Sequence, residues 1–202
     1  VRPILERAFR ARTAMEWERL FGEAQVPSCA VRTTQEWRDG PHVRDSGLVD
    51  DDNHVAPPVW TCDPRPCVAK TTTTPSATTH LPLSNIRVVD LCNVIAGPTI
   101  GMYLAQLGAD VIKIDPPIPN YSPEVTVFYG IACNMGKRSV LMDVRAPAGR
   151  AALEIILRDA DVIVVNCTTE SLERMRLTRD DLARINPNLI LCRFDAWGGP
   201  RE

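Results

Sequence analysis

The residues best suited to binding an anion lie at one junction between a predicted strand and a predicted helix. The junction runs from Asp90 through Gly97 and Pro98 to Gly101. Its two glycines allow close approach of the backbone, and the amino end of a helix favours negative charge. The spacing does not match the G-x-G-x-x-G pattern of dinucleotide-binding proteins. On spacing alone, tight packing of the helix on a sheet is the favoured interpretation, and anion binding is the alternative.

Further polar side chains lie beside predicted strands. Asn166 follows an apolar run, Lys137 and Arg138 precede a second run, Arg145 follows that second run, and Arg174 lies near the end of a short helical stretch. Ammonium and guanidinium groups at loop positions are suited to phosphate. Each of these charges, taken alone, is more typical of a solvated surface.

No catalytic pair, Ser-His-Asp pattern or metal-ligand cluster can be recognised in the sequence. No histidine is placed by sequence as a partner of the aspartates that flank predicted strands, which are Asp90, Asp110, Asp115, Asp143 and Asp161. Cys62 and Cys67 are too far from His54 and His80 in the sequence to suggest a zinc site, so we interpret them as loop thiols and expect no metal. The residue types and their spacing therefore predict an α/β region that is compatible with phosphate binding, and nothing more specific.

The elements that would position these residues follow from the hydrophobic pattern of residues 83–202. Short apolar runs alternate with amphipathic stretches, as in βαβ units. The pattern predicts strands at 86–92, 110–114, 139–142, 161–165 and 189–194, and helices at 98–107, 147–158 and 179–185. We therefore expect an α/β fold with a mostly parallel sheet and helices on both faces. Ligands of such sheets bind beyond the carboxyl ends of the strands.

Residues 1–49 have a mixed, partly helical pattern. Thr13 and Glu16 have the spacing of a capping box, which predicts a helix that ends at about Gly22. A short helix is also expected around 34–38. Residues 50–82 are rich in Pro, Thr and Asp, and this composition does not build a packed core, so we predict a linker or a long surface loop there.

Composition excludes several classes of protein. The 202 residues are 45% hydrophobic and carry a net charge of −2, so there is no basic excess for binding nucleic acid. No apolar run reaches the roughly 18 residues of a membrane span, and no signal-peptide pattern is present. The seven cysteines are an odd number, and buried free thiols in a reducing cytoplasm are the simplest interpretation. Both ends resemble points within a longer sequence, so we interpret the sequence as a fragment.

A series of ordered motifs indicates a family. They are IRVVDL at 86–91, AGP at 96–98, LAQLGADVIKIDP at 104–116, NMGKRS at 134–139 and GGP at 198–200. In this order they resemble family III CoA-transferases, the group of formyl-CoA and carnitine CoA-transferases and α-methylacyl-CoA racemases. TAMEW at 13–17 and GEAQVP at 22–27 resemble the late small-domain region of the same family.

The resemblance implies that 83–202 is the amino-terminal half of a Rossmann-like large domain. Residues 1–49 would then be the late small-domain segment of a preceding unit, and 50–82 would be the linker between tandem units. Full-length family members are interlocked dimers or tandem units. By resemblance, CoA or acyl-CoA would be contacted by Ile95, Ala96, Met142, Asp143, Val144, Arg145, Asn166, Cys167, Thr168 and Arg174. Two features depart from the family: Pro116 and Pro117 stand where many members have a polar or basic residue, and Ile95 replaces a residue that is polar in formyl-CoA transferase.

The implied reaction moves CoA between an acyl-CoA and a small carboxylic acid through an aspartyl intermediate. The acyl-accepting aspartate of the family lies beyond the turn at 198–200, so no catalytic residue is assigned and we expect this chain alone to be inactive. The alternatives are an acyl-CoA racemase or lyase of the same fold, and a non-catalytic fragment that binds CoA or another protein. We expect no nucleic-acid partner and no membrane association.

Overall fold

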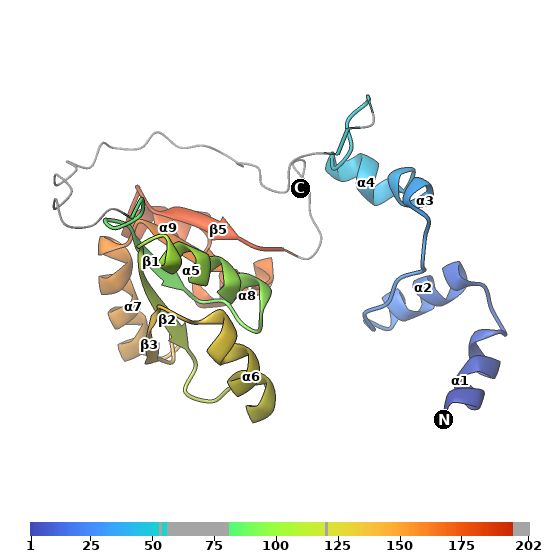
Figure 1. Ribbon diagram of the computed structural model, residues 1–202, viewed down its shortest axis with the longest axis horizontal. Coiled ribbons are helices and arrows are strands. Elements are labelled where there is room, and N and C mark those ends of the chain that lie inside the picture. The colour runs from blue at the N-terminus through green and yellow to red at the C-terminus, as the bar shows by residue number, and fades with distance from the viewer. Residues whose placement is uncertain (53, 56–80, 120, 196–202) are drawn as a thin grey trace. The chain divides into compact units, whose positions relative to one another are not determined.

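The computed structural model describes residues 1–52, 54–55, 81–119 and 121–195 (Figure 1). These residues form two compact units, one up to Val55 and the other from Leu81 onward. Most of the segment predicted as a linker, residues 56–80, lies outside the described residues, as do Cys62, Cys67 and the turn at 198–200.

Short helices make up the first unit. They are α1 (Arg2–Phe9), α2 (Ala14–Glu23), α3 (Thr34–Arg38) and α4 (Pro41–Ser46). The predicted capping box is confirmed, because Thr13 Oγ1 accepts the Glu16 N–H at 3.3 Å and Glu16 Oε2 accepts the Thr13 N–H at 2.8 Å. The short helix at 34–38 is also confirmed, with a second capping box at its start.

The second unit contains one five-stranded sheet. Its strands are β1 (Arg87–Asp90), β2 (Asp110–Asp115), β3 (Arg138–Leu141), β4 (Val162–Val165) and β5 (Ile190–Arg193). All neighbouring strands pair in parallel, in the order β3-β2-β1-β4-β5. The predicted α/β fold is confirmed, and the strand order is that of a Rossmann-like sheet. β2 and β3 lie on one side of β1 and β4 and β5 on the other, so the strand order reverses between β1 and β4.

Helices cover both faces of this sheet. They are α5 (Ala96–Gln106), α7 (Pro147–Asp159), α8 (Thr169–Met175) and α9 (Arg179–Ile185), whereas α6 (Pro123–Cys133) contacts α5. On one face, α7, α8 and α9 supply the fully buried Leu153 and Leu157 and the buried Leu172 and Leu182. On the other face, α5 packs against β1, β2 and β4 (Figure 1). The second cluster there includes the buried Val88, Val111 and Cys92. The two clusters hold the loops at the carboxyl ends of the strands on a rigid base.

The elements that the pattern missed have a physical reason. α6 carries exposed apolar side chains at Val127, Phe128 and Ile131 in addition to the buried Cys133, so its sequence shows no single apolar stripe. α5 begins at Ala96, two residues before the predicted start at Pro98, and proline is tolerated within the first turn of a helix. Among the described residues, no helix is both long and apolar enough to cross a bilayer.

Candidate functional site

Two loops meet where the strand order reverses. The first follows β1 at 91–95, and the second follows β4 at 166–168. The Asn166 side chain joins them: its Oδ1 accepts the Asn93 N–H at 2.9 Å, and its Nδ2 donates to the Asn93 carbonyl at 2.8 Å. This reciprocal pair joins the two loops at the position where parallel α/β sheets bind their ligands.

The loop after β1 has an unusual conformation. Val94 has a φ of 67°, in the left-handed region that a β-branched residue rarely adopts. Val94 is 37% exposed and Ile95 is 40% exposed. Ile95 is the residue before α5 and supplies no side-chain cap, while its carbonyl accepts the backbone N–H and the hydroxyl of Thr99. An exposed apolar loop held in a strained conformation is characteristic of a ligand site.

Both glycines at this junction are required for close packing. A Cβ on Gly97 would lie 2.5 Å from Cys92 Sγ and 3.0 Å from Asn166 Cγ. A Cβ on Gly101 would lie 2.6 Å from Asp90 Oδ2. The packing interpretation is therefore confirmed, because these glycines let α5 approach the sheet and its loops.

Beneath the loop lies a buried ion pair that the sequence did not reveal. Lys137 Nζ lies 2.6 Å from Asp90 Oδ2, 2.6 Å from the Pro98 carbonyl oxygen and 2.7 Å from Asn134 Oδ1. The side chains of Lys137 and Asp90 are 1% and 0% exposed. Lys137 is therefore neither a solvated surface charge nor a free ligand for phosphate. Arg138, the second candidate at this position, pairs with Asp110 at the start of β2.

The segment after β3 forms a tight turn at the same edge of the sheet. Asp143 Oδ1 accepts the Arg145 N–H at 3.0 Å, and this hydrogen bond is the main cause that holds the pKa of Asp143 below its ordinary value. The Arg145 side chain is 75% exposed, with its Nε 3.5 Å from Asp143 Oδ1. Met142 and Val144 pack partly against the core. The turn therefore presents one guanidinium to solvent.

The segment after β4 leads into α8. Thr168 Oγ1 accepts the Ser171 N–H at 3.3 Å and so caps this helix. Cys167 packs against the core, and burial raises the pKa of its thiol. The exposed Arg174 donates from Nη2 to Ser171 Oγ at 2.8 Å. This bond turns the Arg174 guanidinium toward the amino end of α8, beyond the carboxyl end of β4.

The ten residues predicted to contact CoA thus fall at one edge of the sheet, in three groups. The loop containing Ile95 and Ala96 is joined directly to Asn166. The Met142–Arg145 turn lies two strands away from β1, because β2 separates β3 from β1. The sequence does not indicate Asn93, Val94 or the Asp90–Lys137 pair as parts of the site. The one available signal is the position of Asp90 at the end of an apolar strand.

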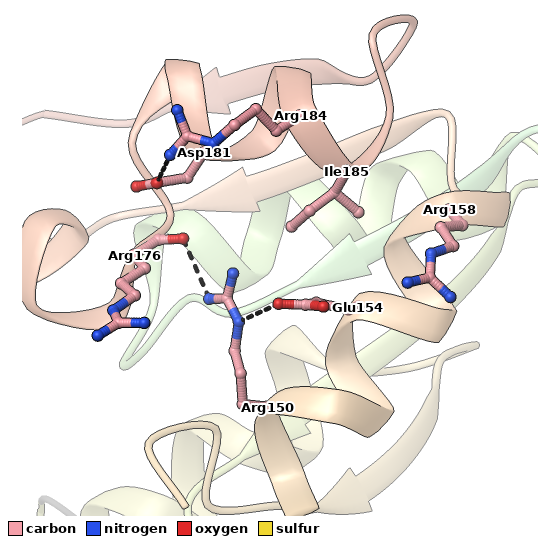
Figure 2. A pocket seen from close by; sticks show the side chains of 7 residues that line it. All are labelled: Arg150, Glu154, Arg158, Arg176, Asp181, Arg184 and Ile185. Atoms are coloured by element: carbon pink, nitrogen blue, oxygen red, sulfur yellow. Dashed lines mark hydrogen bonds and ion pairs between the residues drawn. The ribbon is translucent and has the colours of Figure 1, made fainter. Parts of the chain in front are cut away.

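A cavity of about 360 Å³ lies elsewhere, over α7 and α9 (Figure 2). Its lining consists of Arg150, Glu154, Arg158, Arg176, Asp181, Arg184 and Ile185. Arg150 donates to Glu154 at 2.7 Å and to the Met175 carbonyl at 2.6 Å, and Arg184 pairs with Asp181. None of the ten predicted residues lines this cavity. Within the described ranges, no group of histidine, cysteine and acidic side chains could hold a metal ion.

Comparison with known proteins identifies a family. The model of CoA-transferase family III matches residues 1–80 and 83–202. The CoA-transferase/lyase DddD of Marinomonas sp. (strain MWYL1) is 30% identical, over an alignment that covers 98% of this chain and 28% of that protein. The succinate–glutarate CoA-transferase of Agrobacterium fabrum (strain C58 / ATCC 33970) is 36% identical, over 58% of this chain and 33% of that protein.

A solved structure shows the same fold. The orthorhombic crystal structure of Rv3272 from M. tuberculosis aligns with a TM-score of 0.53 and 34% identity, over 59% of this chain and 34% of that one. The chain therefore spans about a third of the length of the relatives that it matches.

Proposed function

The chain belongs to CoA-transferase family III, and from this premise we propose that the carboxyl edge of its sheet binds coenzyme A in the form of an acyl-CoA. The observation that carries the proposal is the Asn93–Asn166 clamp at the point where the strand order reverses. The clamp holds the loop after β1, which is exposed and apolar. Two exposed guanidinium groups, those of Arg145 and Arg174, lie at the same carboxyl edge of the sheet.

CoA offers phosphates at one end and a long, weakly polar arm at the other. We assign the phosphates to Arg145 and Arg174, because an exposed guanidinium forms charge-assisted hydrogen bonds with phosphate oxygens. Ile95 and Ala96 would contact the adenine or the pantetheine arm. The remaining predicted residues, Met142, Asp143, Val144, Asn166, Cys167 and Thr168, would shape the surface, mostly through the turn, clamp and cap that they form.

We extend the proposal to the organisation of the chain. Residues 83–202 would be the amino-terminal half of a family large domain, and 1–49 the late small-domain segment of a preceding unit, with 50–82 between them. The match of the family model in two stretches, 1–80 and 83–202, supports this tandem arrangement.

For the whole protein we propose transfer of CoA between an acyl-CoA and a small carboxylic acid. In the route that the family implies, an aspartate carboxylate attacks the thioester carbonyl and expels the CoA thiolate, which leaves a mixed anhydride on the enzyme. No aspartate of this chain is assigned that role. The named activities of several relatives, including the formyl-CoA:oxalate CoA-transferase of Rhodopseudomonas palustris (strain HaA2), support the transfer reaction.

A second candidate is a lyase. The relative whose alignment covers 98% of this chain carries the name CoA-transferase/lyase. The two reactions are distinguished by their products in the whole protein. Transfer yields a new acyl-CoA and releases the donor acid, whereas a lyase leaves a carbon–carbon double bond in the acyl chain. Mass spectrometry of the products after incubation with an acyl-CoA and a carboxylate acceptor separates the two outcomes.

Calorimetry with CoA tests the proposed site. A charge-assisted contact with phosphate is worth about 1.5–3 kcal/mol, so Arg174→Ala and Arg145→Ala should each weaken CoA binding roughly tenfold or more. Arg158→Ala is the matched control, because Arg158 lines the cavity over α7 and α9 and is not among the predicted CoA contacts. Unchanged affinity in the first two variants, or equal loss in the control, would count against the site.

A further inference from the structure

We propose that Lys137 and Asp90 act together as the positioning pair that fixes the loop after β1 for ligand binding. This inference rests on the proposed function, because it assigns the pair a role in CoA affinity. Neither side chain is placed in contact with CoA, since they are 1% and 0% exposed.

The contacts of the pair reach both ends of the loop. Asp90 Oδ1 accepts the Cys92 N–H at 2.8 Å and holds the chain as it leaves β1. Its Oδ2 binds Lys137 Nζ at 2.6 Å, and the same ammonium group binds the Pro98 carbonyl at 2.6 Å in the first turn of α5. Asn134 Oδ1 at 2.7 Å completes the three acceptors that an ammonium group can use. The pair therefore connects the start of the loop to its end.

The segment between these anchors is the strained one. Val94, at a φ of 67°, stands between Cys92 and Pro98, and the Asn166 clamp restrains its neighbour Asn93. A residue keeps such a conformation only where its surroundings over-determine it. Gly101 leaves the space for the pair, because a Cβ there would lie 3.1 Å from Lys137 Nζ. Loss of the pair should therefore relax the loop that exposes Ile95.

The energetics of buried ion pairs allow positioning to be separated from stability. Removal of one partner leaves an uncompensated buried charge and is strongly destabilising, whereas removal of both is often close to neutral. The informative variant is therefore the double substitution Asp90→Asn/Lys137→Met, which removes both charges. It keeps an acceptor for the Cys92 N–H, so faster exchange of that amide would report motion of the loop and not loss of the acceptor. Arg138→Met is the matched control, because Arg138 is the next residue and its exposed ion pair with Asp110 lies at the start of β2.

Two measurements on the full chain test the proposal. In amide hydrogen exchange, we expect the Cys92 and Asn93 amides of the double variant to exchange at least tenfold faster, with the Val89 and Ile163 amides of the sheet unchanged. In calorimetry with CoA, we expect its dissociation constant to rise about tenfold. Arg138→Met should leave both results as in the wild type.

Each remaining outcome decides against one of the two proposals. Unchanged exchange in the loop, unchanged CoA affinity despite a loosened loop, or equal loss of protection throughout the sheet would overturn the positioning role. If the wild-type chain does not bind CoA at all, the proposed function fails. The exchange of Cys92 and Asn93 then still decides whether the pair holds the loop.

Discussion

Asn166→Ala should weaken CoA binding at the candidate site as well as lower the free energy of unfolding. The substitution removes both hydrogen bonds to the Asn93 backbone, of 2.9 and 2.8 Å, which hold the loop after β1 against the loop after β4. A typical intramolecular hydrogen bond contributes about 0.5–1.5 kcal/mol, and a partner left unsatisfied adds to the loss. We therefore expect a loss of about 1–3 kcal/mol in the free energy of unfolding.

The effect on binding follows from the freedom that the loop would gain. Without the clamp, the loop containing Ile95 and Ala96 would populate conformations that do not fit CoA, and affinity falls in proportion to the competent fraction. A tenfold loss corresponds to about 1.4 kcal/mol, which lies within the range lost with the two hydrogen bonds. We expect the dissociation constant of CoA to rise about tenfold or more.

Asn186→Ala is the matched control for this prediction. The Asn186 Nδ2 donates to the carbonyls of Leu157 and Ala160 at 3.0 and 2.8 Å, and Asn186 is 6% exposed. It precedes β5, so it lies at the amino ends of the parallel strands, whereas the candidate site lies at their carboxyl ends. Urea unfolding should show at least as large a loss of stability as for Asn166→Ala, while calorimetry should show wild-type affinity for CoA. Equal loss of affinity in both variants would refute the reasoning, because the effect would then come from general destabilisation.

Three further results are expected. Leu153→Ala should lower the free energy of unfolding by about 2–5 kcal/mol because the side chain is fully buried, whereas Ile155→Ala on the same helix, at 62% exposed, should change it by about 0.5 kcal/mol or less in urea unfolding. Iodoacetamide should modify the exposed Cys29 quickly at neutral pH and Cys92 only upon unfolding, since burial raises the pKa of the Cys92 thiol well above its ordinary range; peptide mass spectrometry measures this order. Hydrogen bonds from the capping threonine hold the pKa of Glu16 below its ordinary value of 4.5, so its contribution to α2 is present above that pH and lost as pH falls through the lowered pKa. The protection factors of the α2 amides, which correct for the slower intrinsic exchange in acid, should therefore fall as the pH is lowered, and less so in Glu16→Gln, whereas an equal fall in both would contradict this cause.

The fold was largely predictable because its signals are local. Each strand of the sheet is a short apolar run between turn residues, and the cap at Thr13 depends only on Glu16 three residues later. α6 escaped prediction because periodicity cannot identify a helix that is apolar on several sides. In physical terms, the missing information was which faces of α6 the folded unit covers.

The candidate site was less predictable because its decisive contacts join distant parts of the chain. Lys137 and Asp90 are 47 residues apart, and Asn93 and Asn166 are 73 residues apart. No local pattern links either pair, so the sequence alone predicts a phosphate ligand or a surface charge at Lys137. The resemblance to the family marked Asn166, but its two bonds to the Asn93 backbone emerge only from the folded sheet.

The most direct test of CoA binding at the carboxyl edge is NMR mapping of CoA on the full chain. Titration should shift the backbone amides of Ile95, Ala96 and Asn166–Thr168 and the side-chain signals of Arg145 and Arg174. The arginines that line the cavity over α7 and α9 should remain unperturbed. Shifts confined to those cavity residues, or no shifts in the presence of a large molar excess of CoA, would contradict the proposed site.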